Sequence, residues 1–155
     1  MREHKYKAWD KKYNIMCDVA AINFYYGNVV LKAINTEQLK LFTEFNKQVH
    51  IENMDDRLSV PLQEVELLEF TGLHDKNGTE IYEGDILRLW KSVGSNGELR
   101  REYYKPLAVE YNPNWCQFVV ENKEFKKQRG IWLEFGAFEV IGNIHDNPEL
   151  MKESE

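Results

Sequence analysis

The fold is decided by the stretch FTGLHDKNGTEIYEGDI, which runs from Phe70 to Ile86. Two turn signals lie inside it. In Asp75-Lys76-Asn77-Gly78 the aspartate can accept hydrogen bonds from nearby backbone amides, and Asn-Gly tolerates positive φ. Glu83-Gly84-Asp85 is a second tight turn, and the apolar run 86–90 that follows it is typical of a strand. The stretch therefore predicts closely spaced strands joined by short turns.

Outward from this stretch, short apolar, β-branched and aromatic segments recur between turn signals. We expect strands at 4–9, 15–25, 29–34, 64–70, 86–90, 99–104, 107–111, 115–120, 131–135 and 137–144. Gly27-Asn28 predicts a two-residue hairpin. Residues 36–47 are the one helix candidate, because apolar residues recur there near helical spacing. Residues 48–62 and 91–98 are expected to be irregular connections. This pattern predicts a mainly β chain, α+β at the margin, built as a small barrel or roll.

Composition sets broad limits on the class of protein. The chain has 155 residues, which is enough to bury its own core, and aromatic residues make up 13% of it. A net charge of −6 argues against a strongly basic nucleic-acid binder. The charged N-terminus lacks the apolar segment of a signal peptide, and no apolar run is long enough to span a membrane. We therefore expect a cytoplasmic protein with reduced, packed cysteines at Cys17 and Cys116.

The acidic total hides a basic segment. Residues 51–90 carry ten acidic and three basic side chains, whereas residues 91–130 carry eight basic and five acidic ones. A nucleic-acid surface is one interpretation, since a local basic patch can neutralise phosphates on an acidic protein. The other interpretation is a solvated face of mixed sign. The nucleic-acid candidates are Arg100, Arg101, Lys123, Lys126, Lys127 and Arg129.

The chain lacks the common signatures of catalysis. It has no glycine-rich phosphate loop and no nucleophile elbow, and its histidines and cysteines are too scattered for a zinc site. Asp75 with Glu83 or Asp85 is a candidate carboxylate pair for hydrolysis or metal-assisted cleavage, although turn-forming aspartates explain the same residues. The residues from Asp75 onward do not fit a calcium-binding EF-hand loop. Gly78 stands at the fourth loop position instead of the sixth, and Ile86 stands where the closing glutamate is needed. We assign no catalytic residue, no metal ligand and no cofactor.

At three places the sequence resembles the YopX-like proteins of phages and prophages, a family without an established activity. The places are the opening residues 2–11, the stretch 70–86, and the ending EVIGNIHDNPEL, residues 139–150. The three segments follow one another along the chain in the same order as in that family. The resemblance implies a β-rich protein with a small barrel of the Src-homology-three type in its C-terminal half. It also implies a home in a phage or prophage.

From these observations we expect an N-terminal β portion with one short helix at 1–63, a C-terminal barrel at 64–150 and a frayed tail at 151–155. The leading functional hypothesis is a non-enzymatic binding or assembly module, whose partner is a second copy of the chain or a phage or host protein. Nucleic-acid binding and a carboxylate- or metal-dependent enzyme are the alternatives; no membrane partner is expected. If the family motif carries function, its candidate surface consists of His74, Asp75, Asn77, Tyr82, Glu83 and Asp85.

Overall fold

The computed structural model describes residues 3–32, 50–51, 57–95, 98–103, 105–122, 127–131 and 138–152. The chain divides into two compact units, His4–Glu69 and Phe70–Glu155. Strand pairing in both units is antiparallel throughout the described residues. The prediction of a mainly β chain is confirmed.

The N-terminal unit is one antiparallel sheet. Its elements are β1 (Tyr6–Asp10), β2 (Ile15–Asn23), β3 (Asn28–Lys32), β4 (His50–Ile51), β5 (Arg57–Pro61), the 3-10 turn η1 (Leu62–Glu64) and the first half of β6 (Val65–His74). The strand order is β4-β5-β3-β2-β1-β6. The last strand, β6, lies beside the first, β1, and β3 pairs with β5 instead of β4.

Two sequence expectations in this unit were wrong, and a third lies outside the description. The hairpin loop between β2 and β3 is the four residues 24–27, because Asn23 pairs with Asn28 across it. Within the expected connection 48–62, β5 forms a strand whose residues Leu58, Ser59 and Val60 are buried. The helix candidate 36–47 lies outside the described residues.

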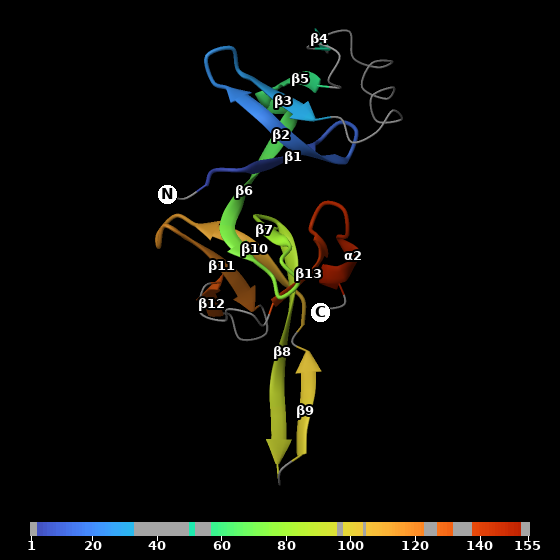
Figure 1. Ribbon diagram of the computed structural model, residues 1–155, viewed down its shortest axis with the longest axis vertical. Coiled ribbons are helices and arrows are strands. Elements are labelled where there is room, and N and C mark those ends of the chain that lie inside the picture. The colour runs from blue at the N-terminus through green and yellow to red at the C-terminus, as the bar shows by residue number, and fades with distance from the viewer. Residues whose placement is uncertain are drawn as a thin grey trace. The chain divides into compact units, whose positions relative to one another are not determined.

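The C-terminal unit contains the remaining elements. They are the second half of β6, β7 (Glu80–Tyr82), β8 (Asp85–Ser95), β9 (Glu98–Tyr103), β10 (Leu107–Asn112), β11 (Gln117–Asn122), β12 (Lys127–Gly130), β13 (Phe138–Asn143) and the short helix α2 (Glu149–Lys152). Five strands form a sheet in the order β12-β11-β10-β8-β13, and β9 pairs with β8 beyond it (Figure 1). Over the described residues this sheet ends at β12 and β13, so closure into the expected barrel is not observed there.

The structure bears on four further expectations in this unit. Residues 91–95 continue β8 and pair with β9, so these residues form a strand where an irregular loop was expected at 91–98. β11 begins at Gln117 instead of residue 115, after a turn in which Cys116 has φ +50°. Of the strand expected at 131–135, only Ile131 is described, in a 3-10 conformation. Of the tail expected at 151–155, Met151 and Lys152 end α2.

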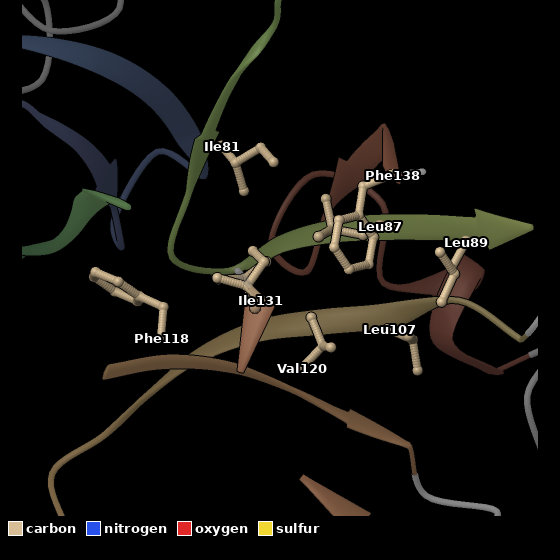
Figure 2. Close-up of a cluster of buried hydrophobic side chains, with 9 residues drawn as sticks. Ile81, Leu87, Leu89, Leu107, Phe118, Val120, Ile131 and Phe138 are labelled. Carbon is tan, nitrogen blue, oxygen red and sulfur yellow. The ribbon is translucent and has the colours of Figure 1, made fainter. Parts of the chain in front are cut away.

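Each unit has its own apolar core. In the C-terminal unit the buried side chains come from several strands and include Ile81, Leu87, Leu107, Phe118, Val120 and Phe138, which Figure 2 shows gathered around β8 and β10. The core of the N-terminal unit contains Ala8, Cys17, Val29, Leu31, Leu58, Val60 and Val65. Burial raises the pKa of the Cys17 thiol to about 12, as expected for a packed and inert cysteine. Cys116, expected to be packed as well, is exposed.

Candidate functional site

Asp75 organises the first turn of the 70–86 stretch. Its side-chain Oδ1 accepts hydrogen bonds from the backbone N–H groups of Asn77 at 2.7 Å and Thr79 at 2.9 Å. The loop is closed by the Asp75 N–H, which donates to the Thr79 carbonyl at 2.8 Å, and Gly78 takes φ +85°. The local sequence is sufficient for this Asx turn, as predicted.

The same carboxylate also binds this turn to β13. Asp75 Oδ2 accepts the Val140 N–H at 3.1 Å, and the Lys76 N–H donates to the Phe138 carbonyl at 3.0 Å. Burial of Asp75 alone would raise its pKa, but the hydrogen bonds from Thr79, Val140 and Asn77 outweigh that effect and lower it. Asp75 is therefore a charged group held by backbone donors.

The second turn, Glu83-Gly84-Asp85, lies against the opposite end of β13. Gly84 has φ +78°, donates its N–H to the Val109 carbonyl at 2.8 Å and accepts the Ile144 N–H at 2.9 Å. A Cβ at this glycine would lie 3.3 Å from the Asn143 side chain. Position 84 therefore needs glycine both for its conformation and for the close approach of a neighbouring segment.

Asp85 is buried and shares a hydrogen-bond network with the end of the chain. Its Oδ2 accepts the Tyr82 N–H at 2.8 Å, and its Oδ1 accepts the Asn143 side-chain amide at 3.1 Å. The Asn143 Oδ1 accepts the His145 N–H, and the Asn147 Oδ1 accepts the Asn143 N–H. The two sequence motifs, 70–86 and 139–150, thus hold one another in place.

The remaining motif candidates lie around β6 and β7. Phe70 opposes Tyr82, and the exposed His74 opposes Glu80, in the β6–β7 pairing. Phe70 contacts both rings, with centroid distances of 5.6 Å to His74 and 5.4 Å to Tyr82. The Tyr82 hydroxyl donates to Glu80 Oε2 at 2.7 Å. These contacts stabilise a cross-strand pair.

The described hydrogen bonds engage the carboxylates of Asp75, Glu83 and Asp85 in holding the fold. Glu83 Oε1 accepts the backbone N–H of Tyr111 at 3.3 Å. Among the described residues, no group of three or more His, Cys, Asp or Glu side chains could hold a metal ion. Asn77 is exposed and its amide contacts Asp75 at 3.5 Å, within the same turn.

The basic candidates occupy separate strands. Arg100 and Arg101 lie on β9, which pairs with β8. Lys127 and Arg129 lie on β12, the end strand of the sheet on the β11 side. Two strands, β10 and β11, stand between β8 and β12 in the sheet order. The pairing therefore does not make the two clusters neighbours. Lys123 and Lys126 lie outside the described residues.

An exposed aromatic tip, Phe24, Tyr25 and Tyr26, lies at the β2–β3 loop and was not identified from the sequence. The three side chains are 77%, 88% and 75% exposed. The Asn23 Oδ1 accepts the N–H groups of Tyr25 and Tyr26, each at 3.1 Å, and the Leu62 N–H donates to the Gly27 carbonyl at 2.8 Å. Three consecutive aromatics directly before Gly27-Asn28 are the available signal, but the predicted strand 15–25 takes in the first two of them.

A smaller aromatic site lies on the β10–β11 hairpin of the C-terminal unit. Trp115 is 53% and Tyr111 is 42% exposed. The Tyr111 ring packs edge-on against Phe118 at a centroid distance of 5.4 Å, so only part of it is available. The aromatic tip is the more exposed of the two sites.

Comparison with known proteins agrees with this architecture. Residues 5–152 match the model of a family described as YopX protein. The chain is similar to the crystal structure of protein EF1440 from Enterococcus faecalis, with 24% identity, a TM-score of 0.54 and coverage of 97% of this chain and 99% of that one. It is also similar to the crystal structure of protein yopX from Bacillus subtilis, with 18% identity, a TM-score of 0.52 and 95% coverage of each chain. None of the curated proteins matches the chain.

Proposed function

We propose a function for this chain from one established premise, that it belongs to the YopX family. The function is that of a non-enzymatic binding or assembly module encoded by a phage or prophage. The phage or prophage origin is what the resemblance to YopX-like proteins implies. The binding role has separate support in the structure, from the residues that the fold engages and the ones that it leaves exposed.

The aromatic tip is the observation that carries the proposal. Covering a phenylalanine or tyrosine side chain is worth roughly 1.5–3 kcal/mol, and aromatic residues dominate the energetic centres of protein interfaces. The tip is preorganised, since Asn23 and Leu62 fix its backbone. Residues 19–31 contain no charged side chain. A partner therefore offers an apolar pocket, and we expect binding that is insensitive to salt.

The proposed compartment is the cytoplasm. Cys17 and Cys116 are both free thiols, which suits a reducing environment. Within the described residues, no helix has the length and apolar character needed to cross a membrane.

Site-specific photo-crosslinking tests the proposed role. A photoreactive phenylalanine analogue replaces Tyr25, and an otherwise identical chain carries it at the exposed Lys32, at the other end of β3. In cells that carry the gene we expect one discrete protein adduct from position 25 and none from position 32. Adding Phe24→Ala and Tyr26→Ala should remove it. The same adducts from both positions, or none from position 25, would contradict the proposal.

The nucleic-acid alternative stays a prediction that the sheet order does not favour. It requires binding that weakens steeply with salt and is reduced by Arg100→Ala with Arg101→Ala. The carboxylate or metal-dependent enzyme is not proposed, because the fold engages Asp75, Glu83 and Asp85 in hydrogen bonds to backbone and amide groups.

A further inference from the structure

The second half of β8 leaves the sheet of the C-terminal unit as a two-stranded ribbon. Among the described residues, the pairing of β8 with β13 and β10 extends to Leu89. From Trp90 to Ser95 it pairs with β9, through six opposed residue pairs that end at Ser95 and Glu98 (Figure 1). Over the described residues, β9 has no second strand beside it.

In the part of the chain that the structure describes, this two-stranded ribbon lacks the further strands or covering element that would stabilise it. A two-stranded hairpin is marginally stable in water, and stability requires further strands or a covering element. The edge of β9 away from β8, which no described strand pairs with, presents backbone N–H and C=O groups that another strand can pair with. The question is which strand fits this edge.

The charge sequence of β9 is complementary to itself. Glu98, Arg100 and Glu102 occupy alternate positions of β9, and their charges alternate in sign along the sequence. In an antiparallel pairing of two copies about a twofold axis, opposed residues belong to the same face. An axis at Leu99 places each Glu98 opposite Arg100 of the second copy, and no like charges meet.

The neighbouring registers are less favourable. An axis at Arg100 opposes Glu98 to Glu102 and Arg100 to itself. An axis at Arg101 opposes that arginine to its own copy. Since opposite-charge cross-strand pairs stabilise a sheet and like-charge pairs destabilise it, the Leu99 register is selected.

We propose that β9 pairs antiparallel with β9 of a second copy, centred on Leu99, to form a four-stranded sheet and a homodimer. This inference adds a surface on the C-terminal unit to the proposed assembly role. It does not involve the aromatic tip of the N-terminal unit. The two proposals can therefore fail separately.

Analytical ultracentrifugation from about 10 µM to about 1 mM chain tests the pairing, because a single strand pair gives a weak dimer. We expect concentration-dependent dimerisation of the wild-type chain. By symmetry, Arg100→Glu or Glu98→Arg alone creates two like-charge oppositions, so each should weaken the dimer by at least about tenfold. The double change, Glu98→Arg with Arg100→Glu, restores complementarity and should recover dimerisation.

Arg101→Glu is the matched control, since it makes the same charge change at a position of β9 that this register opposes to the uncharged Gly97 of the second copy. It should leave the dimer within about threefold of wild type. Unfolding transitions of all variants are compared, so that a misfolded variant is recognised. A wild-type chain that stays monomeric, an unchanged dimer in both single variants, or an equal loss in Arg101→Glu would overturn the proposal. The charges would then only protect the edge from pairing.

Discussion

Asp75 shows at the scale of one residue how an acidic side chain can serve a fold. Its carboxylate accepts three backbone N–H groups, two from its own turn and one from Val140 on β13. The two turn contacts follow from the local sequence and were predicted. The contact with Val140, 65 positions away, depends on tertiary pairing, so no turn signal could reveal it.

Replacing Asp75 by asparagine should destabilise the fold in a pH-dependent way. The folded pKa of Asp75 lies below its unfolded value of about 3.9, so its contribution is full above that value and is lost as pH falls through the folded pKa. At neutral pH we expect a loss of about 1–3 kcal/mol, because an amide NH₂ must replace one acceptor.

Urea denaturation of both chains from about pH 7 to about pH 2.5 checks this sign. The difference in unfolding free energy between wild type and Asp75→Asn should shrink toward low pH. The exposed Asp146→Asn serves as the control. A difference that is constant or grows on acidification is the contrary result.

Gly142 tests the packing between β13 and the segment after it. A Cβ at this position would lie 2.5 Å from Asn147 Oδ1 and 2.9 Å from Leu150 Cδ1. We expect Gly142→Ala to cost about 1–3 kcal/mol, measured by chemical denaturation. Asn147→Ala in the same chain removes one of the two clashes, so the double variant should lose less than the sum of the single changes. Strict additivity would show that the segment yields without strain.

At the scale of elements, the β2–β3 loop combines a backbone fixed by hydrogen bonds with exposed aromatic side chains. Asn23 is the residue that fixes the backbone of Tyr25 and Tyr26. The rings of Tyr25 and Tyr26 pack edge-on against each other, with centroids 4.9 Å apart. Stability and recognition are therefore assigned to different side chains of the same loop.

This assignment predicts a larger loss of stability for one substitution than for the other. Asn23→Ala should lower the free energy of unfolding by about 1 kcal/mol, because two amides lose their acceptor. Tyr25→Ala should change it by less than about 0.5 kcal/mol, as is usual for exposed positions. Thermal and urea unfolding measure both. A larger cost for Tyr25→Ala than for Asn23→Ala would mean that the tip is packed.

The elements missed from the sequence were missed for identifiable reasons. Gly94 and Gly97 suggested an irregular loop at 91–98, but cross-strand pairing with β9 overrides the weak strand propensity of glycine. β5 was not predicted, because the acidic residues before it and Pro61 are typical of an irregular connection. Pro61 occupies the last position of the strand. The strand at 64–70 was found because it combines Val65 with turn signals at both ends.

At the scale of the whole molecule, each unit is organised around its own core. Leu31 in the N-terminal unit and Leu87 in the C-terminal unit are both fully buried. Composition predicted that the chain buries its own core, but it could not show that apolar residues divide into two sets. That division is set by pairing between distant strands, such as β1 with β6 and β8 with β13.

Separate cores predict local responses to cavity-forming changes. Leu31→Ala and Leu87→Ala should each cost about 2–5 kcal/mol. In native-state hydrogen exchange, Leu31→Ala should lower amide protection mainly in β1, β2 and β3, and Leu87→Ala mainly in β8, β10 and β13. Equal loss of protection across the chain in both variants would argue for one cooperative unit.

The motifs 70–86 and 139–150 are architecture, joined by the buried contact between Asp85 and Asn143. A double-mutant cycle of Asp85→Ala and Asn143→Ala, followed by urea denaturation, tests this role. We expect Asp85→Ala to cost at least about 2 kcal/mol and the two changes to couple by about 1 kcal/mol or more. Two variants as stable as wild type, with additive effects, would contradict it and return the motif to the candidates for a functional surface.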